Sequence, residues 1–361
     1  MVQATSAGGS IRKPILLTLI LFLPPTGIGA AQSRVDSAQS YVARGAEWFE
    51  KGEVERAIGD YNLALAFDPS SVTARLNRAI ARASKGDHEG AFDDYTRALE
   101  LDPRQYVAWL NRGNIFFRRG DFKAALGDYD QAVALKQREA MAWSNRGLAR
   151  QRLNDLAGAL DDFNQALKLD PRNSRAWSNL GNLRRAMNED GAALKRFNQA
   201  LRLDPRMSDV WNEKGNLLAD KGDLIGATAA FDQAVALDSG QAVFFNNRGR
   251  VWLASGDLEK AENDLNRALE LDPNLSDAWA HRGIIRAERR DYPQAIADFD
   301  RALKLNPRLA ATWANRGLAL LIQGRIEEAE RDFVRCKELG GRVRPAAEDL
   351  LQELRRQGKS N

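Results

Sequence analysis

Small and aromatic residues recur along the chain at a fixed step of 34 residues, among residues that are mostly polar or charged. At one position of this 34-residue period the residue is Gly, or in one case Ala: Gly45, Ala79, Gly113, Gly147, Gly181, Gly215, Gly249, Gly283 and Gly317. Ala stands twelve residues after each, from Ala57 to Ala329, and an aromatic residue or Leu follows four residues later, from Tyr61 to Phe333. A periodicity of this length indicates stacked structural repeats. The chain therefore divides into nine units: 38–71, 72–105, 106–139, 140–173, 174–207, 208–241, 242–275, 276–309 and 310–343.

Each unit predicts two helices joined by a short turn. In 140–173 the first helix is expected from about Met141 to Leu153 and the second from about Leu156 to Leu169. Gly suits a left-handed helix end and Asp caps the next helix, so Gly-Asp pairs mark the middle of the units: Gly86-Asp87, Gly120-Asp121, Gly222-Asp223 and Gly256-Asp257. A Leu-Asp-Pro sequence ends many of the second helices, because the residue before Pro avoids the helical region.

The offsets of these residues resemble the tetratricopeptide repeat (TPR), with its Trp, Gly, Ala, aromatic, Ala and Pro at set positions. In one unit they are Trp143, Gly147, Ala159, Phe163, Ala166 and Pro171. The resemblance covers 306 of 361 residues and implies an all-α fold, a right-handed superhelical solenoid of helix-turn-helix units. One helix pair cannot bury its apolar face alone, but stacked pairs can.

The two ends of the array are expected to differ from the repeats. Residues 344–361 predict an amphipathic capping helix and tail, with Leu350, Leu351 and Leu354 covering the ninth unit. Residues 31–37 are interpreted as a short flexible lead.

Residues 1–30 have the order of a secretory signal peptide. Arg12 and Lys13 precede a nine-residue apolar core at 15–23, and small residues follow the Pro24-Pro25 break. This core is too short to span a bilayer comfortably, and no Cys follows it to carry a lipid anchor. We therefore expect cleavage, export to a periplasm or to the medium, and no stable membrane insertion afterwards. An uncleaved anchor, or a start codon placed too early, would be the alternative.

Composition is that of a soluble protein, with 44% hydrophobic and 28% charged residues. Without residues 1–30 the chain has 51 basic and 49 acidic residues, a net charge of +2. The pI near 9.2 therefore does not indicate nucleic-acid binding, which needs a basic face. The single cysteine, Cys336, replaces Ala in a small-residue position, so packing is expected rather than thiol chemistry.

The residue just before this recurring Gly is often Arg. It varies together with an Asp sixteen residues later. Seven units have both residues: Arg44 and Asp60, Arg78 and Asp94, Arg112 and Asp128, Arg146 and Asp162, Arg248 and Asp264, Arg282 and Asp298, Arg316 and Asp332. Unit five has Leu180 and Arg196 instead, and unit six has Lys214 and Ala230, so Arg and Asp are lost together. This covariation predicts an Arg–Asp bridge between the two helices of each unit. Duplication of two independent, exposed residues would be the alternative.

No residue pattern indicates catalysis. The two histidines, His88 and His281, have no partner at metal-ligand spacing, and phosphate loops and nucleophile motifs are missing. We therefore expect no enzyme activity, no cofactor and no bound metal.

The resemblance implies that the first helices line a concave groove, where positions 2, 5, 6, 9, 12 and 13 of each unit point inward. Carboxamides fill two of these positions: Asn77, Asn111, Asn145, Asn179, Asn247 and Asn315 at position six, and Asn114, Asn182 and Asn216 at position nine. A carboxamide both donates and accepts hydrogen bonds, so such a row can hold the backbone of an extended peptide. Position five has no Lys, so the carboxylate clamp of chaperone-binding TPR domains is not expected.

Charge divides the groove along the sequence. Units three to five contribute Arg118, Arg152, Arg175 and Arg185 and no acid, whereas units six to eight contribute mainly acids, including Asp209, Glu213 and Asp220. This division predicts a partner with an acidic half and a basic half. The expected function is non-catalytic binding of a protein or peptide in an exported compartment. A structural subunit of an envelope complex, or an auxiliary subunit of a separate enzyme such as a glycosyltransferase, would be the alternatives.

Overall fold

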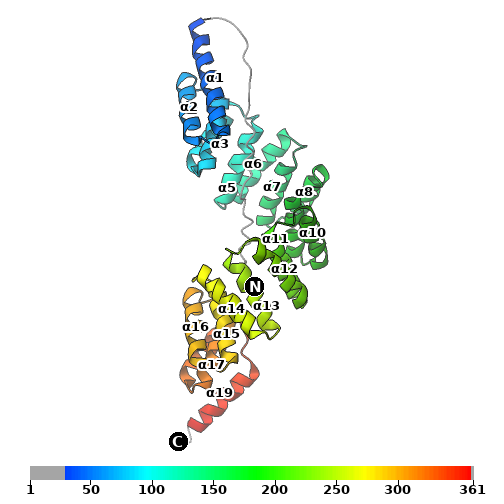
Figure 1. The fold of residues 1–361 in the computed structure, drawn as a ribbon, viewed down its shortest axis with the longest axis vertical. Helices are drawn as coiled ribbons and strands as arrows, with labels where there is room; N and C mark the ends of the chain where they lie inside the picture. The colour runs from blue at the N-terminus through cyan, green and yellow to red at the C-terminus, as the bar shows by residue number, and fades with distance from the viewer. Residues whose placement is uncertain (1–28, 359–361) are drawn as a thin grey trace. The chain divides into compact units, whose positions relative to one another are not determined.

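The computed structural model describes residues 29–358 as two compact units, one ending at Met187 and the other beginning at Asn188 (Figure 1). The first unit contains α1 (Gly29–Glu50), α2 (Val54–Phe67), α3 (Val72–Lys85), α4 (His88–Leu101), α5 (Tyr106–Arg118), α6 (Phe122–Leu135), α7 (Ala140–Arg152), α8 (Leu156–Leu169) and α9 (Ser174–Ala186). The second contains α10 (Asp190–Leu203), α11 (Ser208–Asp220), α12 (Leu224–Leu237), α13 (Ala242–Ala254), α14 (Leu258–Leu271), α15 (Ser276–Glu288), α16 (Tyr292–Leu305), α17 (Ala310–Ile322), α18 (Ile326–Glu338) and α19 (Pro345–Gly358).

Helices pair in sequence order within each unit. An odd-numbered helix packs most closely on the even-numbered helix that follows it, and that helix packs on the next odd-numbered one. The predicted all-α repeat solenoid is confirmed, with helices at the expected places in 140–173. Repeat five is the exception to this grouping, since α9 belongs to the first compact unit and α10 to the second.

The turn inside each repeat is made by a left-handed residue and an Asp cap. Gly86 has φ 92° and Gly120 has φ 81°, and the Asp87 side chain accepts a hydrogen bond from the Gly90 N–H at 2.9 Å. This confirms the predicted role of the Gly-Asp pairs. Non-glycine residues take the left-handed place in three described turns, with φ of 61–64° at Asn154, Asn188 and Arg290.

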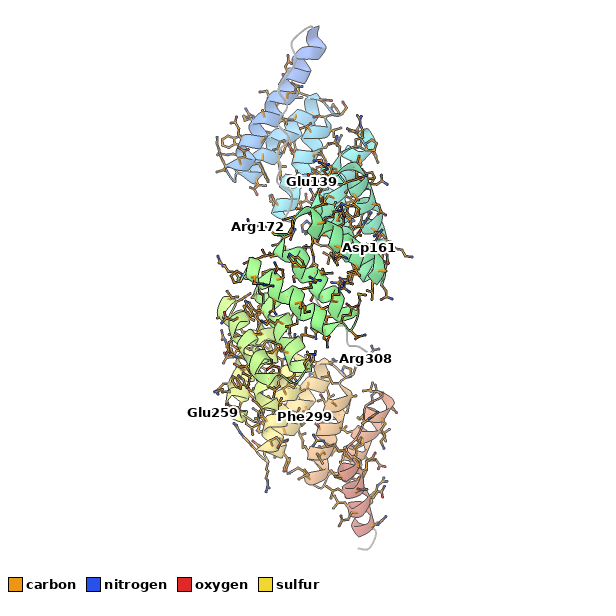
Figure 2. All side chains as sticks on the ribbon, turned by 90° about the vertical axis from the view of Figure 1, so that its right-hand side faces the viewer. Glu139, Asp161, Arg172, Glu259, Phe299 and Arg308 are labelled. Carbon is orange, nitrogen blue, oxygen red and sulfur yellow. The ribbon has the colours of Figure 1, made fainter. Side chains whose placement is uncertain are left out.

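The turn between repeats is closed by an Asp and a Trp. The Asp102 carboxylate accepts from the backbone N–H of Arg104 at 3.0 Å, and the Trp109 indole donates to the Pro103 carbonyl oxygen at 2.7 Å. Other repeats use the same two bonds, so Trp fixes the turn as well as filling space. Arg172 and Arg308, labelled in Figure 2, occupy the exposed third place of two such turns, the second of which begins with Asn306 in place of Asp.

The phase glycines lie where an aromatic ring crosses the first helix. A Cβ on Gly113 would stand 2.7 Å from Cε1 of Tyr129, and one on Gly283 would stand 2.6 Å from Cε1 of Phe299. Phe299, labelled in Figure 2, is fully buried. This position therefore holds Gly in eight repeats and the next smallest residue, Ala79, in one, because a larger side chain would collide with the core ring.

Both ends of the described chain are helical. The helix α19 covers the end of the array, with Leu350, Leu351 and Leu354 packed on the core around Phe333, as predicted. Cys336 is buried in the same core, which confirms its packing role.

At the other end, the structure places the expected flexible lead in a helix. Residues 31–37 lie inside α1, because no Gly or Pro interrupts them and Ala31, Gln32 and Arg34 favour helix. The signal peptide lies almost wholly outside the described residues. Within residues 29–358, no helix has both the length and the apolar character needed to cross a bilayer.

Candidate functional site

The odd-numbered helices form one face of each compact unit, called here the inner face. Odd-numbered helices of neighbouring repeats contact each other, as α5 does with α7 in the first unit and α13 with α15 in the second. Even-numbered helices of neighbouring repeats make few or no such contacts among the described residues. The stack is therefore tightest along the odd-numbered helices, where the candidate binding residues lie.

All seven predicted Arg–Asp bridges are present. In each, the guanidinium donates two bonds to the Asp carboxylate, at 2.5–2.9 Å. The Asp residues are 1–7% exposed, so each carboxylate is buried against its helix partner. Burial lowers the pKa of Arg146, but the hydrogen bonds to and the charges of Asp162 and Asp130 raise it by more. The net pKa is therefore raised, and the guanidinium stays charged. Such buried pairs fix helix register more reliably than they add net stability.

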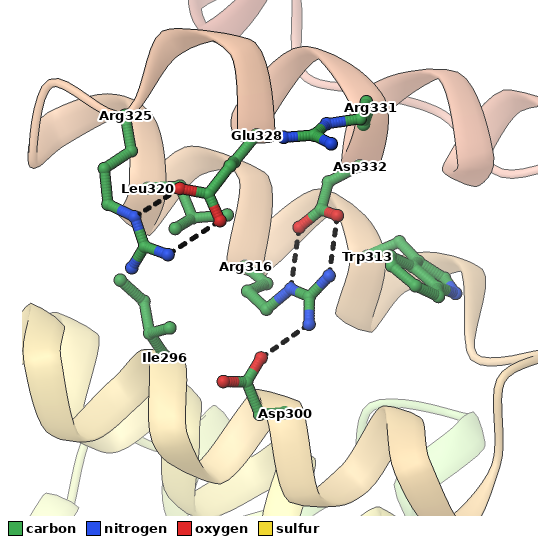
Figure 3. Close-up of a pocket in the computed structure, with 9 residues that line it drawn as sticks. All are labelled: Ile296, Asp300, Trp313, Arg316, Leu320, Arg325, Glu328, Arg331 and Asp332. Atoms are coloured by element: carbon green, nitrogen blue, oxygen red, sulfur yellow. Dashed lines mark hydrogen bonds and ion pairs between the residues drawn. The ribbon is translucent and has the colours of Figure 1, made fainter.

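The third nitrogen of the guanidinium reaches the preceding repeat, which the covariation did not reveal. Arg316 donates two bonds to Asp332 on α18 and a third to Asp300 on α16, as Figure 3 shows. The acceptor sixteen residues before the Arg differs among repeats: Asn62, Thr96, Asp130, Asp232, Asn266 or Asp300. Each of these six Arg residues therefore joins three helices of two repeats.

A pocket of about 350 Å³ lies beside this bridge, between α16, α17 and α18 (Figure 3). Most of its charged lining is already paired, since Arg325 donates to both carboxylate oxygens of Glu328 at 2.7 Å and Arg316 is held by two carboxylates. We therefore assign its residues to the scaffold rather than to a binding site.

The nine predicted asparagines lie at two depths on the inner face. Asn77, Asn111 and Asn114 are buried, at 2, 5 and 8% exposure. The other six are partly exposed: Asn145, Asn179, Asn182, Asn216, Asn247 and Asn315. A ligand on the inner face meets the second group, whereas the first group lies beneath the surface.

Several of these carboxamides link consecutive odd-numbered helices. Asn145 donates to Asn114 at 2.9 Å, and Asn179 donates to the Ser144 hydroxyl at 3.5 Å. In the second unit, Asn247 donates to Asn212 at 2.9 Å. Part of each amide is therefore used inside the scaffold, and the remaining donor or acceptor positions are left for other contacts.

The first unit carries the predicted basic residues on its inner face. Helices α3, α5, α7 and α9 contain no Asp or Glu. Arg118, Arg152 and Arg175 are exposed and Arg185 is partly exposed. The Arg152 guanidinium lies 5.9 Å from the ring centroids of both Phe117 and Phe122, which form an edge-on pair. Cation and aromatic rings together make a surface suited to an acidic or amphipathic segment.

The second unit presents acids on its own odd-numbered helices. Asp209 and Asp220 are exposed and Glu213 is partly exposed, all on α11. Arg250 on α13 lies 4.0 Å from Asp220 and donates to Asn216 at 3.4 Å.

A chain of hydrogen bonds crosses three repeats of the second unit. His281 Nδ1 lies 3.0 Å from the Asn246 carboxamide oxygen, Asn246 donates to Asn247 at 3.3 Å, and Asn247 donates to Asn212. Burial lowers the pKa of His281 to about 4, against a smaller raising effect of Asp277. The ring is therefore neutral at pH 7 and donates through Nδ1.

Three residues of these networks were not among the predicted site residues: Ser144, Asn212 and Asn246. All stand at position five of their repeats. A step of 35 residues separates each from the Asn or His that contacts it, as from Asn212 to Asn247, and this step was the available signal.

The family model of the tetratricopeptide repeat matches the chain in overlapping segments: 43–106, 76–142, 110–174, 144–189, 179–242, 226–276, 246–308 and 281–335. The chain therefore belongs to the tetratricopeptide repeat family, whose arrays are generally non-catalytic scaffolds that bind protein or peptide partners.

Solved structures agree on the fold. A tetratricopeptide repeat protein from Parabacteroides merdae ATCC 43184 is 20% identical, with a TM-score of 0.57 over 69% of this chain and 99% of that one. The Cut9–Hcn1 hetero-tetramer of the APC/C contains a chain that is 17% identical, with a TM-score of 0.60 over 88% of this chain and 76% of that one. These similarities show the fold alone. No curated protein sequence matches the chain.

Proposed function

We propose that the chain is an exported, non-catalytic scaffold that binds extended segments of a protein partner on its inner faces. The first compact unit takes an acidic segment and the second takes a basic segment. One observation carries the proposal: four consecutive odd-numbered helices, α3 to α9, hold no acid while presenting Arg118, Arg152 and Arg175.

These three arginines differ from the bridging ones in burial and in the face on which they lie. Arg78, Arg112 and Arg146 are partly buried and each bonds a buried Asp on an even-numbered helix. Arg118, Arg152 and Arg175 lie on the exposed surface instead. A cluster of one sign on one face attracts the opposite charge and speeds encounter with it more than it adds affinity.

Charge reversal tests the first unit. A labelled poly-glutamate peptide is titrated into the protein and into the double variant Arg152→Glu and Arg175→Glu, and binding is followed by fluorescence anisotropy. We expect the double variant to abolish binding, and added salt to weaken wild-type binding without removing it. The matched control is Lys123→Glu with Lys168→Glu, the same charge change on the even-numbered helices α6 and α8.

The carboxamides give a second measurement. Asn145→Ala with Asn179→Ala should weaken binding of acidic peptides of different sequence by similar factors, because amides contact the backbone common to all of them. Unchanged binding in the charge-reversal variant would contradict the proposal. The outer surface or the ends of the array would then be the place to search, in keeping with an assembly role.

The second unit is tested with a poly-lysine peptide. Its binding should depend on Asp209, Glu213 and Asp220, so the triple change to Asn, Gln and Asn should remove it. The Arg152→Glu and Arg175→Glu variant should retain poly-lysine binding. Equal loss in both variants would show that the peptides do not distinguish the two faces.

Export rests on the order of basic, apolar and small residues in 12–31. Protein purified from its native host should begin at Ala31 or Gln32 by mass measurement. An intact Met1 in the cytosol would overturn this part of the proposal and leave the binding proposal untouched.

A further inference from the structure

Lys214 is a lysine at a position where most repeats have a bridging arginine. Position seven of the repeat holds Arg in seven repeats, from Arg44 to Arg316, whereas repeat five has Leu180 and repeat six has Lys214. A guanidinium keeps its charge in proteins, but a lysine amine loses its proton readily when its surroundings favour the neutral form. Lys214 is therefore the residue at this position whose nitrogen can become a nucleophile.

The carboxylate that holds the bridging arginines is missing from repeat six. A buried Asp stands sixteen residues after each of the seven arginines, but Ala230, which is 2% exposed, stands sixteen residues after Lys214. In the next repeat, by contrast, Arg248 donates two bonds of 2.7 Å to Asp264. Ala230 on α12 offers no such counter-charge to Lys214.

The bond to the preceding repeat is missing as well. Six bridging arginines donate to the residue sixteen positions before them, as Arg248 does to Asp232 at 2.8 Å. The corresponding residue for Lys214 is Asn198 on α10. Among residues 29–358, no hydrogen bond or ion pair joins the Lys214 amine to Asn198 or to any other side chain. The charged residues at the facing positions do not help, since Arg196 on α10 has the same sign and Asp232 on α12 is bonded to Arg248.

One contact of the bridging arginines remains. The Lys214 Nζ lies 4.9 Å from the centroid of the Trp211 ring, much as the Arg282 guanidinium lies 4.6 Å from that of Trp279. An indole attracts a cation, but less strongly than a hydrogen-bonded carboxylate does. The ring therefore contacts the amine without replacing the missing negative charge.

Partial burial without a counter-charge makes this amine reactive. Lys214 is partly exposed, so small molecules in solution can reach its side chain. Burial lowers its pKa, and no carboxylate acts against that change. More of this side chain is therefore neutral at a given pH than for a lysine in full contact with water. The neutral amine is the form that attacks carbon.

We propose that Lys214 is a site of N-acylation, modified by small acyl phosphates, of which acetyl phosphate is the simplest. The neutral Nζ attacks the carbonyl carbon of the acyl group and forms a C–N bond. The bond from that carbon to the phosphate oxygen breaks, phosphate leaves with the electron pair, and the proton on nitrogen passes to water. The product is an uncharged amide, so the reaction removes a partly buried charge that has no carboxylate partner.

Acetyl phosphate itself is the probe. The full-length protein is incubated with it, and acetylation of each lysine is followed over time by mass spectrometry of the peptides. Lys221, exposed just after the same helix α11, is the internal reference. We expect Lys214 to be acetylated faster than Lys221 at pH 7. The rate at Lys214 should also level off at a lower pH than the rate at Lys221, because its proton is lost earlier.

Ala230→Asp tests the cause. It gives repeat six the carboxylate found in seven repeats, which should pair with Lys214 and stabilise the ammonium. An opposite charge nearby typically changes a pKa by about 1–3, and a change of 1 alters the amount of free amine about tenfold. Acetylation of Lys214 should therefore slow by roughly tenfold or more, with the rate at Lys221 unchanged. The matched control is Ala229→Asp, the adjacent exposed residue of α12, which should leave both rates unchanged.

Two results would overturn the site: acetylation of Lys214 no faster than that of Lys221, or an unchanged Lys214 rate in Ala230→Asp. Circular dichroism checks that Ala230→Asp folds. If it does not fold, the comparison of Lys214 with Lys221 in the wild-type protein, with its pH profile, decides alone. None of these outcomes bears on peptide binding, since Lys214 is not among the residues proposed to contact the partner.

Discussion

Arg248 and Asp264 face each other across the two helices of repeat seven, with two parallel hydrogen bonds of 2.7 Å. Asp264 is 7% exposed, so its charge has little access to water. The third nitrogen of Arg248 donates to Asp232 of the preceding repeat at 2.8 Å. One guanidinium therefore sets the spacing of helices both within a repeat and between repeats.

Breaking this bridge should destabilise the fold. Arg248→Ala and Asp264→Ala are each expected to lower the free energy of unfolding, and the double variant should lose less than the sum. A double-mutant cycle followed by denaturant unfolding measures this coupling energy. Contacting groups typically show about 0.5–3 kcal/mol. Additive losses would mean that the two residues are inherited together without acting together.

Repeat four provides an internal comparison. Arg146 bonds Asp162 in the same way, but Arg150 also donates to Asp162 at 3.0 Å. Arg146→Ala and Asp162→Ala should again cost less together than in sum. Arg146→Ala should cost less than Arg248→Ala, because Arg150 continues to neutralise the buried carboxylate.

A side chain at Gly113 should collide with the ring of Tyr129. Gly113→Ala places a Cβ 2.7 Å from Tyr129 and is expected to destabilise by about 1–3 kcal/mol through overpacking. The control is Gly127→Ala in α6, where a Cβ meets nothing within 4 Å. That change should stabilise by about 0.5–1 kcal/mol, because Ala loses less backbone entropy in a helix. Thermal unfolding checks both: the Tm should fall in Gly113→Ala and rise in Gly127→Ala.

Arg290 occupies a left-handed turn place that Gly fills in other repeats. Its φ is 63°, which costs a residue with a side chain roughly 1–2 kcal/mol. Arg290→Gly should therefore raise the free energy of unfolding by about 1 kcal/mol. Gly256→Arg, at the same place in repeat seven with φ 83°, should lower it by a similar amount. A loss of stability in Arg290→Gly would show that the arginine has a role outside the turn.

His281 should make stability depend on acid pH. Its pKa is about 4 in the folded protein and ordinarily 6.5, so between these values the unfolded chain binds more protons. Stability should therefore fall as pH drops from about 6.5 to 4, by at most about 3 kcal/mol. Asp277 and Arg250 are the charged groups that act on the ring. His281→Asn, the residue found at this position in most repeats, should remove this contribution in urea unfolding at each pH.

The helices, their turns and the Arg–Asp bridges could all be predicted from the sequence, because each repeats in phase. Unit five, with Leu180 and Arg196, was decisive for the bridge, since it showed both residues changing at once. The third bond of each Arg could not be seen in this way. Its acceptor is Asn62 in one repeat and Asp130 in another, since any oxygen at the right distance serves.

The depth of the asparagines was not predictable for a different reason. Asn111 and Asn145 hold the same position of the repeat, yet one is buried and the other is partly exposed. Burial depends on side chains of neighbouring helices, which the position of one residue in its own repeat does not specify.

The guanidinium that joins neighbouring repeats also bears on how the array comes apart. Repeats five and six have Leu180 and Lys214 in its place, and these two repeats are adjacent along the chain. In a linear stack, opening begins where neighbours are least coupled. Backbone amides of α9 and α11 should therefore exchange with deuterium earlier than those of α5 or α15. Denaturant would then melt the molecule in two steps, and a stretched molecule would give way first in the middle.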